Sequence, residues 1–219
     1  MIGIVWHGHS CFEIYGDNKP RILIDPHDGY SIGLKPPKPG DPDIVLITHN
    51  HFDHNYYKPY QGESLIVKWR PGTIREKSVV IEGIEVPHDE SRGTQRGMVV
   101  TYKIDYGGIV ITHLGDIGTE KLGEEALQRL AGSNIVMIPV GGVYTIGAVA
   151  ANRLLDLLKP NIAIPMHFWV KGMTLPIDPL ERFLEYSRFK KYRFDSNRVE
   201  LDELNIPDPV HLFILKTPS

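Results

Sequence analysis

The most informative segment of this 219-residue chain is the hexapeptide His49-Asn50-His51-Phe52-Asp53-His54, whose His and Asp side chains can all bind metal ions. It directly follows the apolar run at residues 44–47, which has the pattern of a buried strand. Side chains two residues apart on an extended chain point the same way, so His49 and His51 converge on one point. The turn that follows directs the last two side chains of the hexapeptide to a second point. The spacing therefore predicts a site for two metal ions.

Such a site needs further ligands, because zinc takes four or five in total and the hexapeptide offers at most two to each ion. Three other residues share the placement of His49, at the carboxyl end of an apolar run. His88 follows residues 84–87, Asp116 lies in the turn after residues 109–114, and His167 follows residues 162–166. We expect all three to be metal ligands.

Several polar residues near predicted strand ends leave two interpretations open. His7, His9 and His113 are hydrogen-bonded loop histidines on the simpler interpretation, and His9 could instead be a partner of a metal ligand or a proton donor. Asp25 ends a buried-type strand, so it must find donors, and the ring N–H groups of ligating histidines can supply them. Cys11 lies inside a strand and is expected to be a small core residue.

Candidate substrate contacts follow the predicted ligands along the chain. Arg92, Arg96 and Lys171 could hold an anionic substrate, although cations in loops are usually only solvated. Tyr144 comes just after Gly141-Gly142, where a bare backbone permits close approach of a ligand, so we expect Tyr144 in the wall of the pocket.

The elements that must position these residues change character along the chain. The first half contains hairpin turns at residues 16–19 and 107–108 and strands at residues 2–6, 11–15, 21–25, 43–48, 64–69, 79–86, 98–105 and 109–114. A helix capped by Thr119 is expected next. Strands at 134–140, 161–165 and 210–215 then alternate with helices at 148–158 and 179–189. This order predicts an α/β (α+β) chain with helices packed on a sheet, and the length fits one domain over residues 1–219.

Composition limits the classes of function. The formal net charge of −3 gives no basic field for nucleic acid, so a nucleic-acid substrate is not expected. No apolar run approaches the roughly 20 residues of a membrane span, and the amino terminus lacks the pattern of a signal peptide. One cysteine cannot form an internal disulfide. We expect a cytoplasmic protein that acts on a small molecule, with homo-oligomerisation left open.

The ligand pattern resembles the metallo-β-lactamase superfamily of metal-dependent hydrolases. The hexapeptide, His88, the Gly115-Asp116 turn and His167 occur in the same order along the chain, and the likeness covers nearly all 219 residues. The segments Gly8–Phe12, Ile24–Pro26 and Pro139–Thr145 look most similar to the branch that includes L-ascorbate-6-phosphate lactonase and N-acyl phosphatidylethanolamine phospholipase D. The long insertion with which nuclease branches hold RNA or DNA is not found.

The resemblance implies a four-layer αββα sandwich with a dinuclear site on one edge. It implies His49, His51 and His88 on the first metal, Asp53, His54 and His167 on the second, and Asp116 as a bridge between them. Asp116 suits a bridge because its two oxygens and negative charge offset the repulsion between two dications. Asp53 could also accept a proton.

Two divalent ions about 3.5 to 4 Å apart can lower the pKa of a shared water from 15.7 toward 7. The leading hypothesis is therefore a hydrolase of a small ester, lactone or phosphodiester that uses two ions, with zinc expected and manganese, iron or nickel as alternatives. An iron-dependent oxidoreductase on the same fold is the rival enzyme. A non-catalytic, metal-stabilised binding protein is the rival outside enzymology.

Overall fold

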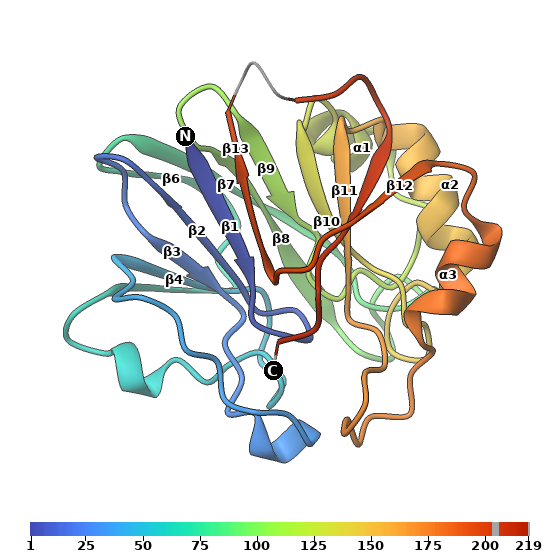
Figure 1. The fold of residues 1–219 in the computed structure, drawn as a ribbon, viewed down its shortest axis with the longest axis horizontal. Helices are drawn as coiled ribbons and strands as arrows, with labels where there is room; N and C mark the ends of the chain where they lie inside the picture. The colour runs from blue at the N-terminus through green and yellow to red at the C-terminus, as the bar shows by residue number, and fades with distance from the viewer. Residues whose placement is uncertain (203–205, 219) are drawn as a thin grey trace.

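Two β-sheets pack face to face in the computed structural model, which describes residues 1–202 and 206–218 (Figure 1). The first sheet has six strands in the described residues. Their order is β13 (Arg198–Leu201), β1 (Ile2–Trp6), β2 (Phe12–Gly16), β3 (Ile22–Ile24), β4 (Ile44–Ile47) and β5 (Leu65–Lys68). The strands from β13 to β3 are antiparallel to their neighbours, whereas β3, β4 and β5 run parallel.

The second sheet has eight strands in the same described part of the chain. Their order is β12 (Lys190–Arg193), β14 (His211–Ile214), β11 (Ile162–Met166), β10 (Ile135–Pro139), β9 (Val110–His113), β8 (Met98–Asp105), β7 (Val79–Pro87) and β6 (Gly72–Glu76). The strands from β12 to β9 are parallel, and β6 to β9 form an antiparallel meander. The expected change from hairpins to alternating strands and helices is therefore confirmed.

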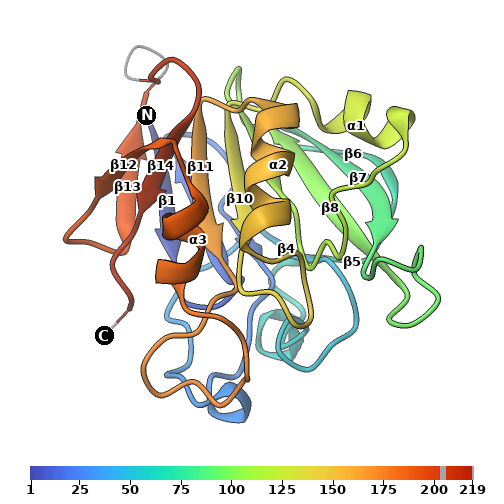
Figure 2. The same ribbon diagram turned by 90° about the vertical axis from the view of Figure 1, so that its right-hand side faces the viewer.

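The α-helices lie on the outer face of the second sheet (Figure 2). They are α1 (Glu124–Leu130), α2 (Ala148–Leu158) and α3 (Leu180–Tyr186). Helix α2 buries Ala148, Ala151, Leu154, Leu155 and Leu158, whose helical spacing is what predicts a helix in this segment. Among the described residues, no helix is long and apolar enough to cross a membrane.

The outer face of the first sheet is covered differently from the expected helical layer. Its buried side chains Cys11, Leu23, Val45 and Ile47 are packed against Tyr57, Tyr60 and Ile66. Tyr60 belongs to a short 3₁₀ helix, η2 (Lys58–Tyr60), and a second one, η1 (Tyr30–Ile32), follows β3. The mixed α/β fold with two sheets is confirmed, and large aromatic side chains on a loop replace an α-helix as the cover of this face. Cys11 is a buried core residue, as expected.

The differences from the predicted elements have local causes. Strands β6, β12 and β13 were not predicted because they lie at the edges of the described sheets and lack an apolar run. Most side chains of β6 and β12 are exposed, and β13 alternates exposed with buried ones. The expected cap by Thr119 is wrong, since Gly123 is the N-cap of α1. Thr119 is buried and its hydroxyl accepts a hydrogen bond from the backbone of Lys121.

The carboxyl ends of strands from both sheets meet at one edge of the sandwich. Strands β1, β3 and β4 run in one direction in the first sheet, and β7, β9 and β11 end along the same edge of the second. Backbone hydrogen bonds join the sheets there: Val100 N–H donates to the Thr48 carbonyl (2.9 Å), and His167 N–H donates to the His9 carbonyl (3.2 Å). The residues that follow these strands are therefore held close together.

Gly118 is one position at this edge that leaves no room for a side chain. A Cβ there would lie 2.1 Å from the carbonyl carbon of His88 and 2.2 Å from the nitrogen of Asp89. We expect Gly118→Ala to lower the free energy of unfolding by about 1–3 kcal/mol, the usual cost of overpacking, measured by urea denaturation. The matched control is Gly123→Ala, since a Cβ at Gly123 has no neighbour within 4 Å, and it should cost less. Equal losses in both variants would contradict this account.

Candidate metal centre

A first group of donor atoms comes from His49, His51 and His88, which follow strands β4 and β7. The Nδ1 atom of His51 lies 3.0 Å from Nε2 of His49 and 3.3 Å from Nε2 of His88. His49 and His88 are buried, whereas His51 is exposed. Three ring nitrogens that converge on one point from two sheets could hold a metal ion, and the exposed His51 leaves that point open to solvent.

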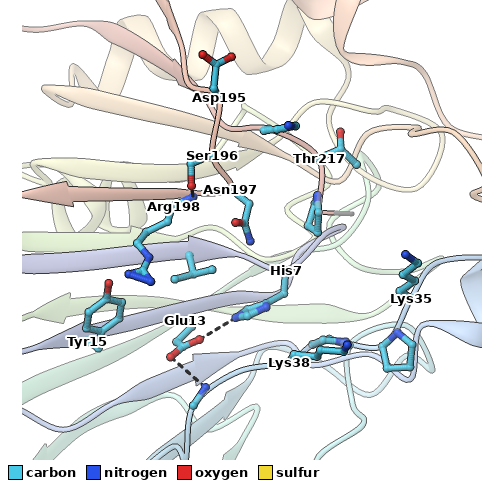
Figure 3. Close-up of a pocket in the computed structure, with 16 residues that line it drawn as sticks. His7, Glu13, Tyr15, Lys35, Lys38, Asp195, Ser196, Asn197, Arg198 and Thr217 are labelled. Atoms are coloured by element: carbon cyan, nitrogen blue, oxygen red, sulfur yellow. Dashed lines mark hydrogen bonds and ion pairs between the residues drawn. The ribbon is translucent and has the colours of Figure 1, made fainter.

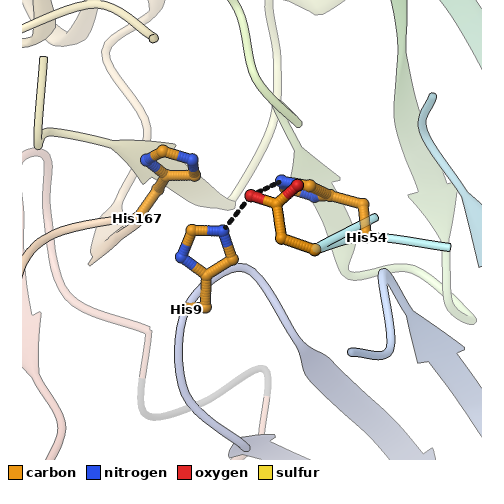
Figure 4. A group of neighbouring side chains, drawn as sticks. His9, His54 and His167 are labelled. Carbon is orange, nitrogen blue, oxygen red and sulfur yellow. Dashed lines mark hydrogen bonds and ion pairs between the residues drawn. The ribbon is translucent and has the colours of Figure 1, made fainter. Parts of the chain in front are cut away.

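A second group is wholly buried and contains His9, Asp53, His54 and His167. Oδ2 of Asp53 lies 3.0 Å from Nε2 of His9 and 3.4 Å from Nε2 of His54. The rings of His9, His54 and His167 lie close together, and each is carried by a different segment of the chain (Figure 4). His9 was not among the predicted ligands, although its place after a strand was the signal that the other ligands share.

Asp116 lies between the two groups. Its Oδ2 atom is 3.3 Å from Nε2 of His167, 3.8 Å from His49 and 3.7 Å from His88, and its Oδ1 atom is 3.3 Å from Nε2 of His54. Burial alone would raise the pKa of Asp116, but the charges of His167 and His54 outweigh it and hold the pKa well below its ordinary value. An ionised carboxylate thus faces both groups at once.

Several buried atoms at this centre have no hydrogen-bond partner. They include Nε2 of His54, Nε2 of His167 and Oδ1 of Asp116. Buried polar atoms are normally paired, because each unpaired one costs free energy of desolvation. Unpaired nitrogen and oxygen atoms aimed at a common space are the donor set of a divalent cation, so the residues present fit a metal site.

Asp25 and Thr48 hold two of these histidines in place. Oδ2 of Asp25 accepts hydrogen bonds from Nδ1 of His54 (2.9 Å) and from the hydroxyl of Thr48 (2.7 Å), and that hydroxyl lies 2.9 Å from Nδ1 of His49. A proton on each Nδ1 leaves Nε2 of His49 and of His54 free to face the centre. Asp25 therefore has the contact expected from the sequence, whereas the role of Thr48 was not anticipated.

The other histidines near strand ends are tied to the backbone or to acids. His113 is buried, with Nε2 2.9 Å from the Ser10 carbonyl and Nδ1 accepting from Gly115 N–H (3.2 Å). His7 contacts Glu13 (2.8 Å). Both face a hydrogen-bonding partner rather than the donor groups, which agrees with the simpler interpretation.

Two cavities adjoin the first group, and Arg96 lines both. One, of about 460 Å³, includes His88, Tyr144 and Thr145, and the other, of about 260 Å³, includes His49 and His51. The Arg96 guanidinium donates to the Val143 carbonyl (2.7 Å) and lies 4.9 Å from the centre of the Tyr144 ring. Arg96 and Tyr144 are thus brought to the metal centre. Arg92 and Lys171 are exposed and line neither cavity.

A further cavity, of about 530 Å³, is separate in its lining from the donor groups (Figure 3). Its wall includes the contact between His7 and Glu13, and Glu13 also pairs with Arg21. Lys35, Lys38 and Arg198 lie around it. None of the predicted metal ligands lines this cavity.

The profile of the beta-lactamase superfamily domain matches residues 3–167, which contain every donor of both groups. The chain belongs to the metallo-β-lactamase superfamily. Within it, the chain is 33% identical over 191 residues to a UPF0173 metal-dependent hydrolase of Thermoplasma volcanium, an alignment that covers 76% of this chain and 83% of the relative. A UPF0173 metal-dependent hydrolase of Desulfitobacterium hafniense is 30% identical, with 90% and 94% of the two chains covered.

Solved structures agree with this family. A Thermotoga maritima protein described as a Zn-dependent hydrolase of the superfamily is 27% identical, covers 99% of this chain and 100% of its own, and superposes with a TM-score of 0.76. The expected superfamily and the expected class of metal-dependent hydrolase are confirmed. The likeness to the lactonase and phospholipase D branch stays a prediction.

The variant Asp25→Asn tests whether Asp25 supports metal binding through its hydrogen bonds. In Asp25→Asn the amide N–H₂ must face either the backbone N–H of Thr48, which donates to Oδ1 (2.8 Å), or the Thr48 hydroxyl and Nδ1 of His54, which both donate to Oδ2. A donor then faces a donor in either orientation, and in the second the ring of His54 loses its fixed tautomer. We expect metal affinity to fall about 10- to 100-fold, the usual effect of removing a partner of a ligating histidine, measured by competition with a chelator. Asp28→Asn is the control, because Asp28 is partly exposed and contacts only Ser31 among the described hydrogen bonds. Unchanged affinity in Asp25→Asn would contradict this role.

Proposed function

We propose that this hydrolase uses two divalent metal ions to cleave a small ester, lactone or phosphodiester. The observation that carries the proposal is that two donor groups, which could each hold an ion, share the carboxylate of Asp116. His49, His51 and His88 would hold the first ion, and Asp53, His54 and His167 the second. When bound, two divalent ions supply an activated water at neutral pH and stabilise the charge that develops on the leaving group.

The proposed catalytic roles of Asp53 and Asp116 follow from their charge. Burial alone would raise the Asp53 pKa, but the charge of His54 and the hydrogen bond with His9 hold it well below its ordinary value. Asp53 is therefore ionised at neutral pH and can hold a cation, while remaining a weak acceptor for a proton. Asp116 keeps its two oxygens available to both groups.

The metal proposed from the sequence is zinc, with manganese, iron or nickel as alternatives. The Thermotoga maritima relative is described as Zn-dependent, which supports zinc. The rival, an iron-dependent oxidoreductase, has a fold neighbour in CmlA, a diiron β-hydroxylase of Streptomyces venezuelae that is 14% identical with a TM-score of 0.57. The much nearer relatives are named as hydrolases, so hydrolysis is favoured over both oxidation and a non-catalytic binding role.

The proposed substrate is a small anionic molecule. The two cavities beside the first group have about 460 Å³ and 260 Å³, within or just below the size of small-ligand sites. Arg96 would bind the anionic group and Tyr144 would form the wall, while Arg92 remains a predicted contact on the same loop. The cytoplasmic location and any homo-oligomer also remain predictions from the sequence.

Elemental analysis of the metal-replete protein tests the proposal directly. We expect two divalent ions per chain, together with turnover on at least one of a panel of phosphodiesters, lactones and acyl esters. One ion or none in folded protein would overturn the dinuclear site. Iron with oxygen consumption and no hydrolysis would favour the oxidoreductase.

Asp116→Asn should abolish most of the hydrolytic activity while the protein stays folded. The amide has nearly the same size, but it is neutral and a far poorer partner for two cations. Loss of comparable electrostatic stabilisation lowers turnover about 100- to 1,000-fold, and we expect at least that effect at saturating metal. Circular dichroism checks the fold. A variant that kept more than about a tenth of the turnover, a barrier change below roughly 1.4 kcal/mol, would exclude Asp116 as the bridge.

Arg96→Gln should weaken binding of an anionic substrate with little effect on the chemical step. Gln is neutral but can still donate to the Val143 carbonyl, so the loop should keep its shape. We expect KM to rise about 10-fold or more for an anionic ester, in line with the loss of a charge-assisted hydrogen bond, and to change little for a neutral ester. Arg92→Gln measured beside it tests the second arginine. Equal KM changes for charged and neutral substrates would contradict the role of Arg96.

A further inference from the structure

His9 projects from the loop after β1 into the second donor group. The ligand atoms of His9, Asp53, His54 and His167 all lie within 4.8 Å of one another. The His9 ring centre is 4.2 Å from that of His167 and 5.1 Å from that of His54 (Figure 4). We propose that His9 is an additional ligand of the second metal ion, which would then have five protein donors: His9, Asp53, His54, His167 and Asp116. This inference rests on the proposed dinuclear function.

The spacing of the donor atoms supports ligation of a common ion. Two atoms that are each about 2.1 Å from an ion are roughly 3.0 Å apart when they meet at a right angle and about 3.4 Å apart at the tetrahedral angle. The contact between His9 Nε2 and Asp53 Oδ2 is 3.0 Å, and those from His54 and His167 to the carboxylates are 3.3 to 3.4 Å. His9 has the spacing of a neighbouring ligand in a crowded coordination sphere.

The backbone holds the His9 ring in this direction. His9 has a φ of 51°, in the left-handed region that is uncommon for residues other than Gly and that Asn, Asp and His adopt most readily among them, and it follows Gly8 at φ 95°. Its carbonyl accepts from the indole N–H of Trp6 (2.9 Å) and from the backbone N–H of His167 (3.2 Å). The loop is therefore fastened to the segment that carries another predicted ligand, and the imidazole points inward.

The burial of His9 also suits a ligand. The side chain is fully buried, so its ring nitrogens cannot be solvated by bulk water. Buried imidazole nitrogens normally have a partner, and a metal ion at the second group would be one. His9 could also donate a hydrogen bond from Nε2 to Asp53, and that alternative needs no contact with His54 or His167. The proximity of His9 to all three residues favours the ligand.

With five protein donors, the second position should prefer different metal ions from the first. The first group offers three imidazoles and Asp116, a four-donor set of the kind zinc takes. Five nitrogen and oxygen donors with room for one more suit ions that favour six ligands, such as Mn²⁺ or Fe²⁺. The second position should therefore discriminate against Mn²⁺ less strongly than the first, and His9 is the residue that produces the difference.

His9→Gln separates a ligand from a hydrogen-bond donor. The Gln side-chain amide reaches about as far as Nε2 of His and can still donate to Asp53, but it is a poor metal ligand. We expect the affinity of the second position for Mn²⁺ to fall more than about 100-fold, beyond the usual effect of a supporting residue, and its affinity for Zn²⁺ to fall less. Chelator competition with each metal gives both affinities. Co²⁺ substitution should show stronger visible absorption in the variant than in the wild type, as the number of ligands falls.

His27→Gln is the matched control. His27 is also a buried imidazole, with its ring centre 6.4 Å from that of His9, but it belongs to none of the donor groups in the described residues. We expect His27→Gln to keep the wild-type metal affinities and Co²⁺ spectrum. A similar loss in both variants would show a general effect of disturbing this buried region and would overturn the assignment.

A measurement on the unaltered protein decides the question if His9→Gln fails to fold. Pulsed electron paramagnetic resonance of Mn²⁺ at the second position, with Zn²⁺ at the first, should detect three coordinated imidazoles. Two imidazoles, or a His9→Gln protein that keeps its Mn²⁺ affinity, would make His9 only a hydrogen-bonding partner of Asp53. Wild-type protein that binds one ion or none would instead overturn the proposed dinuclear function.

Discussion

The balance of charge at the buried donor cluster constrains the rest of this structure. Asp25, Asp53 and Asp116 are buried within a few ångströms of His54, and their charges raise the pKa of that imidazole well above its ordinary value even though burial opposes it. Carboxylates taken out of water cost several kcal/mol each unless a positive charge compensates them. A proton on His54 compensates only part of this negative charge, and it occupies the ring nitrogen that faces the centre. Cations that replace this proton compensate more charge and also satisfy the unpaired atoms of His167 and Asp116.

The two sheets supply the rigidity that such a cluster needs. Each donor follows a strand whose apolar residues are fixed in the core, so the donor's backbone position is set by packing rather than by the loop itself. Hydrogen bonds from Val100 to Thr48 and from His167 to His9 then join the sheets at the level of the site. Because the donors come from both sheets, loosening this junction would separate the groups, so we expect metal binding and the packing of the sandwich to stabilise each other.

The sequence predicted the parts of the site that have a local signal. The hexapeptide from His49, with His88, Asp116 and His167 at the ends of apolar runs, identified a set of residues that the structure brings together. His9 carries a weaker signal, because a lone histidine after a short strand is more often a hydrogen-bonded loop residue, and its left-handed backbone is invisible before folding. Arg92 and Arg96 looked equivalent along the chain, yet only Arg96 lines the cavities, since loop curvature decides which side chain turns inward. Edge strands such as β12 were missed because their side chains are exposed and give no apolar pattern.

The two donor groups differ in how they meet solvent, and this difference assigns them different tasks. The second group is buried on all four of its side chains, whereas His51 of the first group is exposed and both cavities lined by Arg96 adjoin that group. We therefore propose that a substrate approaches from the side of the first group, where Arg96 and Tyr144 line the cavity. The second group lies deeper in the protein than the first. The low dielectric there would strengthen the electrostatic effect of a bound cation on any charge that develops between the two groups. Asp116 faces both sides, so the accessible group and the buried group cannot act independently of each other.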